Sequence, residues 1–523
     1  MRPRLALLTV LCAAALATGL CGQALAAGGG GGARAGLTAQ QRAVLHGIAA
    51  DTWRFYGADV DPVTHLPLDN LGPGAVRGAY TSAANIGVYL WAVVAARDMH
   101  LIDTATAQRL ASATLSEVAT LTRYKGFLYQ WYDTANGKVL LNPGQGDCTA
   151  TTSTGDNCSF VSAVDNGWYA SGLIVARQAL PGVRDLASRL LSDMDFSIFY
   201  DNRPQTDCNT NASIAGNQPT GQQYGGFYVG QGPAGYHNGA LYSDPRISMY
   251  IGMGLHQMPG DVWWRTWRTL PPQRCPTDPD FSWQGQWPVP GYWQTITDPQ
   301  SHKQFQVWEG HYVYSVPPAP SITFIPTFGG GMFEGLMANL VVPETQWGTH
   351  SFGLADLRWA QVQERYDTQV LHDPVWGMSP SSTPDDTGNY SAFGVQGLAF
   401  GAGEGLAQDV CAPTPGTPCT NEDAVTPHAS AIALPVIPQA AYANLQRLRA
   451  DYPGLYRADG GFYDAVNPKT GSIGHRRLVL DQSMIMAGLD DALNDGALQR
   501  DFARDPVSWA ARTYLSVERM SIR

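Results

Sequence analysis

Apolar residues recur along this chain mainly at the three- and four-residue spacing of an α-helix. Ile86, Leu90 and Val93 fall on one helix face, and residues 108–121 repeat the pattern. Alternating patterns that would predict β-strands are few and short. The spacing therefore predicts an all-α protein.

Helix-start signals occur at six places, and a second helical segment follows each of them. Ser162 and Asp165 have the spacing of a capping box, and Asp244-Pro245 predicts an N-cap followed by proline at the first helical position. Six helix pairs in series predict an (α/α)6 barrel with one helix of each pair inside. The starts lie near Ser82, Ser162, Asp244, Gly331, Thr426 and Asp481, and the second segments span residues 104–122, 183–199, 261–269, 349–371, 438–450 and 501–518.

Long loops separate the helix pairs. Residues 200–240 and 270–328 are rich in Gly, Pro, Gln and aromatic residues, and we expect them to build the walls of a cleft. No low-complexity linker divides residues 37–523, which predicts a single domain. Parallel inner helices would bring their N-terminal ends together at one end of the barrel, with Asp165, Asp244, Glu334, His428 and Asp481.

The N-terminal residues have the pattern of an export signal. A basic start is followed by the apolar stretch Leu5–Leu20 and by the small-residue cleavage site Ala24-Leu-Ala26. This predicts a signal peptide over residues 1–26 and a Gly-rich linker over residues 27–36. No later stretch is long and apolar enough to predict a membrane-spanning helix, so we expect a secreted protein.

The cysteines suggest disulfide bonds. Cys21 could instead mark a lipoprotein, but Leu20 stands where lipid attachment favours a small residue. An even number of cysteines in an exported chain is typical of disulfides, and no Cys-x-x-Cys spacing predicts zinc. We expect the pairs Cys148–Cys158, Cys208–Cys275 and Cys411–Cys419, while the other pairings that six cysteines allow remain open.

The amino-acid composition limits the classes of molecule that this protein is expected to bind. The formal net charge is −11 and only 15% of residues are charged, so the basic surface typical of nucleic-acid binding is absent. The chain has 15 Trp and 23 Tyr, whose flat rings with polar edges suit sugars, although a large core also contains aromatic residues.

Several carboxylates are candidates for glycosidic chemistry, which generally needs two carboxyl groups: one protonates the leaving oxygen, and the other activates water or attacks carbon. Asp165, Asp244 and Glu334 could alternatively serve only as helix caps or partners of the helix dipole. Asp133 and Glu309 could be simple loop acceptors.

A helix N-terminus lowers the pKa of a nearby carboxyl group, whereas a general acid must hold its proton near the working pH. Desolvation or a second carboxylate would have to outweigh the dipole. Acids crowded at one end of the barrel would meet this requirement.

Other side chains could bind a sugar. Trp53, Trp131, Trp168, Trp308 and Trp376 could stack on sugar rings or pack in the core. His428 could bond substrate hydroxyls or merely close a helix turn. The Gly-x-Ser-x-Gly elbow of serine hydrolases and the phosphate-binding Gly-x-x-x-x-Gly-Lys loop are both absent.

Ten short motifs follow one another through most of the mature chain. They are Thr81-Ser-Ala-Ala-Asn-Ile-Gly87, Trp131-Tyr-Asp133, Val164-Asp-Asn-Gly-Trp168, Pro245-Arg-Ile247 with Tyr250-Ile-Gly252, Trp308-Glu-Gly310, Gly330-Gly-Met-Phe-Glu334, Trp376-Gly-Met-Ser-Pro380, Val425-Thr-Pro-His-Ala-Ser430, Gly461-Phe-Tyr-Asp464 and Leu480-Asp-Gln-Ser-Met484. In this order they resemble the bacterial glucoamylase-like family. That family includes the domain attached to cyclic β-1,2-glucan synthases and is related to secreted endo-β-1,2-glucanases.

The resemblance implies an (α/α)6 barrel that acts as a glycoside hydrolase on a glucan or oligosaccharide. It implies Asp165 and Asp244 as the catalytic pair and Glu334 as a third acid. Asp244 stands where the family usually has Glu, which shortens the side chain by one methylene. The residues expected to bind substrate are Trp131, Asp133, Trp168, Arg246, Glu309, Trp376, His428 and Asp464.

Two other functions fit the same chain. A carbohydrate-binding protein could keep the barrel without the chemistry, and helical toroids also host polysaccharide lyases. We expect an oligo- or polysaccharide as partner, no nucleic acid, a monomer, and neither cofactor nor metal. Acid-rich loops could nevertheless hold Ca²⁺ without a sequence signature.

Overall fold

The described residues are mostly helical, as the apolar spacing predicts. The computed structural model describes residues 36–523 except residues 75, 150–156, 204–219, 272–288 and 396–423. Residues 36–523 form one unit by their contacts. The predicted signal peptide and all but the last residue of the predicted linker lie outside the described residues. Among the described helices, none has the length and apolar character needed to cross a bilayer.

Six helices form the centre of this unit, and they begin at the six predicted starts. Nearly every residue of the three examples α3, α7 and α14 is buried, as expected for helices surrounded by other elements. The six are α3 (Ala83–Asp98), α5 (Ala163–Ala179), α7 (Arg246–Gly254), α10 (Met332–Leu336), α14 (Pro427–Ala433) and α16 (Val479–Leu493).

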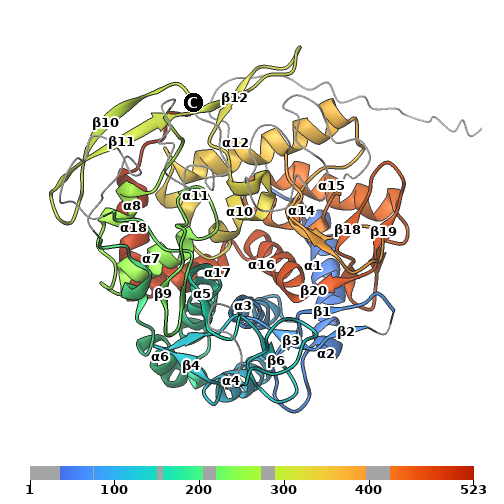
Figure 1. The fold of residues 1–523 in the computed structure, drawn as a ribbon. Helices are drawn as coiled ribbons and strands as arrows, with labels where there is room; N and C mark the ends of the chain where they lie inside the picture. Colours follow the sequence, from blue (N-terminus) through green and yellow to red (C-terminus); the bar gives the residue numbers. More distant parts are fainter. Residues whose placement is uncertain (1–35, 75, 150–156, 204–219, 272–288, 396–423) are drawn as a thin grey trace, which may run out of the picture. The chain divides into compact units, whose positions relative to one another are not determined.

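These six helices contact one another in a closed series (Figure 1). Helix α3 packs against α5 and α16, α5 against α7, α16 against α14, and α14 against α10. Arg246 at the start of α7 closes the series by donating hydrogen bonds to the backbone carbonyls of Glu334 and Gly335 in α10. Gly87 is required where α3 meets α5, because a Cβ there would lie 2.3 Å from the Trp168 carbonyl oxygen.

A second set of helices packs outside the first. Each contacts a neighbouring inner helix: α1 contacts α16, α4 contacts α3, α6 contacts α5, α12 contacts α10 and α15 contacts α14. Their bounds are Ala39–Trp53 for α1, Thr104–Val118 for α4, Arg184–Ser192 for α6, Phe352–Arg365 for α12 and Pro438–Asp451 for α15. Helix α1, capped by Thr38, was not predicted from the sequence. Short helices α2 (Tyr56–Asp59), α8 (Asp261–Arg265) and α11 (Glu344–Trp347) complete the set.

The prediction of one helix over residues 501–518 is wrong. Two helices occupy this region, α17 (Ala497–Arg504) and α18 (Trp509–Val517), and Pro506 lies between them. Proline has no backbone N–H and interrupts an α-helix. The break lets α17 contact α3, α5 and α16, whereas α18 packs on α7 and α11.

Strands are short and occur in the connections between helices. The longest pair is an antiparallel hairpin of β10 (Gly291–Thr297) and β11 (Gln304–Gly310), within the loop 270–328. The sequence pattern did not predict it. The others are β1 (Asn70–Leu71), β2 (Arg77–Gly78), β3 (Tyr80–Thr81), β4 (Arg123–Tyr124), β5 (Phe127–Leu128), β6 (Tyr132–Asp133), β7 (Phe160–Ser162), β8 (Gly226–Tyr228), β9 (Gly232–Pro233), β12 (Tyr312–Tyr314), β13 (Ile322–Phe324), β14 (Ser381–Ser382), β15 (Tyr390–Ser391), β16 (Tyr456–Arg457), β17 (Gly461–Phe462), β18 (Ala465–Val466), β19 (Ile473–Gly474) and β20 (Arg477–Leu478).

One predicted disulfide lies within the described residues. Cys148 and Cys158 are bonded to each other. The other two predicted pairs, Cys208–Cys275 and Cys411–Cys419, lie outside the described residues.

Candidate active site

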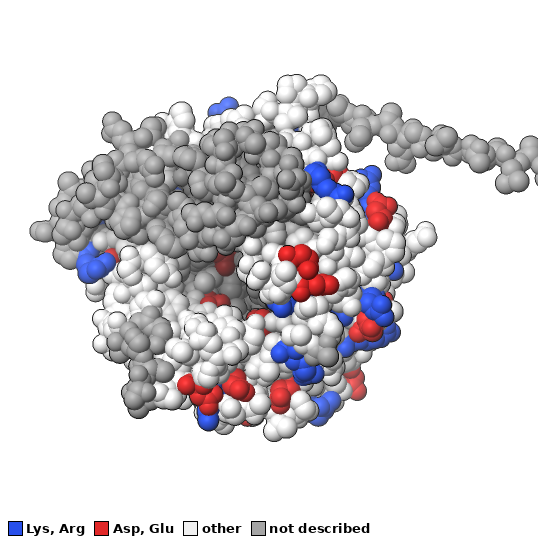
Figure 2. All heavy atoms as spheres, turned by 45° about the vertical axis from the view of Figure 1, so that its right-hand side comes forward, with Lys and Arg blue, Asp and Glu red and all other residues white. Residues whose placement is uncertain are grey.

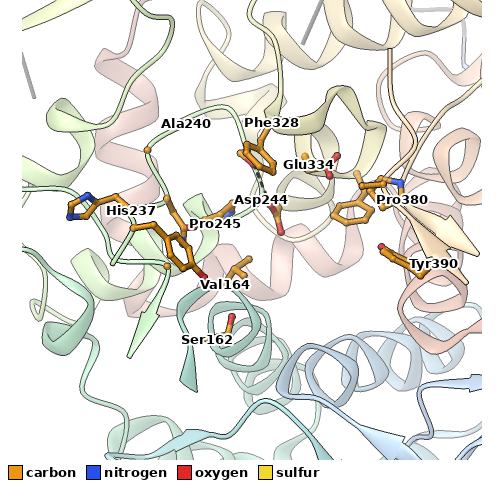
Figure 3. A pocket seen from close by; sticks show the side chains of 17 residues that line it. Ser162, Val164, His237, Ala240, Asp244, Pro245, Phe328, Glu334, Pro380 and Tyr390 are labelled. Carbon is orange, nitrogen blue, oxygen red and sulfur yellow. Dashed lines mark hydrogen bonds between the residues drawn. The ribbon is translucent and has the colours of Figure 1, made fainter. Parts of the chain in front are cut away.

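A pocket of about 290 Å³ opens beside the N-terminal ends of α5, α7 and α10. Figure 2 shows a hollow in the surface with acidic side chains inside it. In the close-up, the carboxylates of Asp244 and Glu334 and the side chain of Tyr390 are directed into one cavity (Figure 3). The lining residues used below are Ser162, His237, Ser243, Asp244, Phe333, Glu334 and Tyr390.

Asp165 is the third residue of α5, but it does not complete the predicted capping box. The Ser162 hydroxyl accepts the Asp165 backbone N–H at 3.2 Å, as predicted. The reciprocal bond, from the Ser162 N–H to the Asp165 carboxylate, is not formed. Instead the carboxylate accepts a hydrogen bond from the Gln130 amide at 3.2 Å. Burial raises the pKa of Asp165, and hydrogen bonds from Ser162 and Gln130 partly offset this.

Asp244 lies just before α7 and lines the pocket. Pro245, rather than Asp244, is the N-cap residue, and no backbone N–H in this turn bonds the Asp244 carboxylate; the prediction of an Asp244 N-cap is therefore wrong. The Ser243 hydroxyl donates to its Oδ1 at 3.3 Å. Burial raises the pKa of Asp244 to about 6; the Trp168 side chain and Arg246 lower it, and the charge of Asp165 raises it.

Asp165 and Asp244 are thus electrostatically coupled, although they are far apart in the chain. Trp168 is 2% exposed, and its side-chain hydrogen bond to Asp244 favours the ionised carboxylate. The indole N–H is the only polar group of a Trp side chain, so it must be the donor. Trp168 therefore positions Asp244 rather than offering a face for sugar stacking.

Glu334 is the third residue of α10 and lines the pocket opposite α7. Its side chain lies so close to the preceding turn that a Cβ on Gly331 would be 2.1 Å from Glu334 Oε2. The Gly-rich start of this helix therefore has a steric purpose, because any larger residue at position 331 would displace the carboxylate.

Arg246 is fully buried and does not line the pocket. It forms a bidentate ion pair with Glu344 over N–O distances of 2.7 and 2.8 Å. It also donates to the carbonyls of Ser243 and Glu334, which belong to the turns that carry two pocket acids. The structure thus places Arg246 behind the site, where it holds these turns together.

His237 and Tyr390 are among the pocket residues that the sequence reasoning missed. His237 accepts or donates a 3.0 Å hydrogen bond with Asp201 and stacks on Tyr224. Tyr390 comes from the β14–β15 hairpin. Tyr390 is 49% exposed, but desolvation of its hydroxyl, and then the charges of nearby acids, raise the pKa of Tyr390 above its ordinary value. Only the prediction that residues 200–240 form a cleft wall pointed towards His237.

Four other predicted subsite residues are not among those that line the pocket. Asp133 accepts the Ala135 N–H at 2.7 Å, as a loop acceptor does, and Trp131 packs edge-on against Tyr80. Trp376 is 3% exposed and packs in the core. Glu309 lies on β11 beside a separate pocket, where burial and then Glu518 raise its pKa to about 8.

The remaining predicted residues, His428 and Asp464, meet Asp481 in a buried cluster. Each of the three is 1% exposed, and none lines the pocket. The Phe333 ring, which does line the pocket, lies 6.4 Å from the His428 ring. The predicted gathering of helix starts therefore divides into an open part and a buried part.

Comparison with known proteins shows what parts of this chain are similar to. Residues 323–506 match the Glycoamylase family, whose description reads "Putative glucoamylase". The predicted resemblance to the glucoamylase-like family is confirmed. The matched part contains Glu334, His428, Asp464 and Asp481, whereas Asp165 and Asp244 precede it.

A curated relative matches a shorter stretch. The cyclic β-(1,2)-glucan synthase NdvB of Rhizobium meliloti is 28% identical over 159 residues. The match covers 29% of this chain but only 6% of NdvB, so the chain corresponds to a small part of that protein.

Solved structures share the fold over most of the chain. The endo-β-1,2-glucanase of Chitinophaga pinensis, solved with sophorotriose and glucose, is 14% identical with a TM-score of 0.60, covering 91% of this chain and 98% of the other. The β-1,2-glucanase of Parabacteroides distasonis is 14% identical with a TM-score of 0.62, covering 91% and 60%. A mutant of the Talaromyces funiculosus endo-β-1,2-glucanase, solved with β-1,2-glucan, is 11% identical with a TM-score of 0.55, covering 89% and 92%.

Proposed function

We propose that this protein is a secreted glycoside hydrolase that cleaves β-1,2-linked glucan. The coupled pair of Asp165 and Asp244 beside a pocket that also contains Glu334 carries this proposal. The fold shared with β-1,2-glucanases supports the substrate. We further propose that residues 37–523 form one (α/α)6 catalytic domain, that residues 1–26 direct export, and that the protein is a monomer.

Asp244 is the proposed general acid. Its pKa of about 6 keeps a large fraction of the carboxyl group protonated in mildly acidic solution. Burial outweighs the opposing effects of Trp168 and Arg246, and the adjacent charge of Asp165 acts in the same direction as burial. Asp165 therefore tunes the proton donor as a neighbouring carboxylate.

Glu334 is the proposed second carboxylate because it lines the same pocket. In the reaction, the Asp244 carboxyl group gives its proton to the glycosidic oxygen while the bond from that oxygen to the anomeric carbon breaks. Water then adds to the anomeric carbon, and Glu334 accepts the proton that the water loses. His237 and Tyr390 are placed to bond sugar hydroxyls along the pocket wall.

A panel of purified polysaccharides tests this function. The full chain should release reducing sugar from linear β-1,2-glucan and not from β-1,3-glucan, cellulose or starch, with products identified by NMR. Turnover of an α-linked glucan instead would contradict the substrate assignment. A product with a new carbon–carbon double bond would show a lyase.

A non-catalytic sugar-binding protein is the second candidate. It is favoured by Asp244, which is one methylene shorter than the Glu that the resembled family usually has at this position. A slip of about 1 Å in a catalytic group can cost on the order of 100-fold in rate. Calorimetry that shows β-1,2-glucan binding to folded protein, without any reducing-end release, would select this candidate.

A further inference from the structure

The side chains of His428, Asp464 and Asp481 form a compact cluster, here called the buried triad. They come from the first turn of α14, the segment between β17 and β18, and the first turn of α16. Their potential ligand atoms all lie within 4.8 Å of one another. His428 Nδ1 is 3.3 Å from Asp481 Oδ2. Three segments distant in sequence thus converge on one point.

Most polar atoms of the buried triad have no hydrogen-bond partner among the described residues outside the triad itself. This holds for both ring nitrogens of His428, both carboxylate oxygens of Asp481 and Oδ1 of Asp464. Asp464 Oδ2 accepts the Ser382 N–H at 2.7 Å. Buried polar atoms without partners are costly, and so many in one place indicate a ligand that satisfies them.

The charge around the triad is also unbalanced. Asp69 is a third acid, only partly buried, and its charge acts on Asp481. The positive charge acting on Asp464 and Asp69 comes from Arg476. When ionised, the three carboxylates exceed the one guanidinium by two negative charges, which a divalent cation would neutralise.

We propose that His428, Asp464 and Asp481 bind one divalent transition-metal ion, of the Zn²⁺ or Mn²⁺ class. An imidazole together with carboxylates suits such ions, whereas Ca²⁺ takes about 6–8 oxygen ligands. Bonds of about 2.0–2.2 Å to one ion require the ligand atoms to approach one another slightly more closely than they do here. The 3.3 Å between His428 Nδ1 and Asp481 Oδ2 is already a separation that two ligand atoms of one ion can have.

The metal would join elements that stand next to the pocket. It would tie the starts of α14 and α16 to the β17–β18 segment. The Phe333 ring, which lines the pocket, lies 6.4 Å from the His428 ring, and the charges of Asp464 and Asp481 act on the Tyr390 hydroxyl. The site therefore differs from the sequence-based expectation that no metal is bound, and it does not depend on the proposed glycosidase activity.

Metal content and spectroscopy of the full chain test this site without substrate. The protein is stripped with a chelator and titrated with Zn²⁺, Mn²⁺ and Co²⁺. We expect one equivalent bound per chain by elemental analysis, a higher Tm, and a visible Co²⁺ absorption band. H428Q and D481N should each weaken binding at least about tenfold, as expected when a metal site is damaged. D386N is the control, because Asp386 pairs with His475 at the surface with both side chains over 40% exposed.

Two results would overturn the proposal. One is folded wild-type protein that binds no stoichiometric metal and shows no Tm response, in which case the carboxyl groups of Asp464 and Asp481 share a proton instead. The other is one bound equivalent whose affinity is unchanged in H428Q and D481N. If a variant does not fold, metal content and the Co²⁺ band of the wild-type protein still decide.

Discussion

The acids at the starts of the inner helices fall into two regions with the same local design and different surroundings. Asp165, Glu334 and Asp481 each occupy the third position of an inner helix. Asp165 and Glu334, with Asp244, stand at or beside an open pocket and are here called the pocket carboxylates. Asp481 lies in the buried triad, where it is 1% exposed.

The difference shows that access, rather than position on a helix, decides the chemistry of these acids. A helix N-terminus favours the ionised form in every case, but burial raises the pKa of Asp165, Asp244 and Asp481. Where solvent and substrate can enter, a raised pKa makes a proton donor. Where they cannot, the same burial favours the neutral acid, and the ionised form is stable only beside a cation.

The largest expected effect on activity comes from removing the proton donor of the pocket carboxylates. Asp244→Asn should lower kcat/KM on β-1,2-glucan by about 100-fold or more, since general acid catalysis contributes about 10²–10⁴ in rate. D133N is the matched control, because Asp133 is a loop acceptor outside the pocket. A D244N protein with more than a tenth of wild-type activity would contradict the assignment.

The same substitution should not destabilise the fold. The folded-state pKa of Asp244, about 6, lies above the ordinary value of 3.8, so the protonated form is favoured by folding. The group therefore weakens the fold as pH rises from about 4 through 6, by about 1–3 kcal/mol at neutral pH. Asparagine cannot ionise, so the Tm of D244N at pH 7 should equal or exceed that of the wild type. A lower Tm would favour a structural role.

The largest loss of stability should come from the buried ion pair behind the pocket. Glu344→Gln leaves the Arg246 charge without its partner and should cost about 3–5 kcal/mol in the free energy of unfolding. Denaturant unfolding measures this, with E364Q as control, because Glu364 is only partly buried. A cost below about 1 kcal/mol would mean that the carbonyls around Arg246 suffice to compensate its charge.

A smaller change should separate positioning of Asp244 from catalysis. Trp168→Phe removes a hydrogen bond that favours the ionised carboxylate, so the pKa of Asp244 should rise. Activity that needs protonated Asp244 falls as pH increases through about 6 in the wild type, and this limb should move to higher pH in W168F. W91F is the control for packing, since Trp91 contacts Trp168 edge-on. An unmoved pH profile would refute the role of Trp168.

The smallest expected effect on activity concerns an acid outside both regions. Glu309→Gln should leave kcat/KM nearly unchanged, because Glu309 does not line the pocket. Its folded-state pKa, about 8 instead of 4.5, means that stability is lost as pH rises from about 4.5 to 8. The Tm of E309Q minus that of the wild type should therefore increase between about pH 4.5 and pH 8 and stay constant at higher pH. A large drop in activity would instead support the sequence-based prediction that Glu309 binds substrate.

The helical pattern and the helix caps were readable locally. Periodic apolar residues and local start signals placed all six inner helices, because these signals act within a few residues. A side-chain cap forms only at α3 and α5 among them. Residue type and the family resemblance predict that Trp168, Arg246 and Glu309 bind substrate. Whether an aromatic or charged side chain faces a pocket or the core depends on contacts with distant segments, such as Glu344 for Arg246.

The amino-acid sequence by itself therefore determined the six inner helices, the family resemblance and the set of acids available for chemistry. Only the tertiary structure decided which acids share a pocket, which of them are sealed in the buried triad, and that Asp165 acts on Asp244. The physical reason is that helix formation depends on neighbours in sequence. Desolvation and charge coupling, which set the pKa of a carboxyl group, depend on neighbours in space.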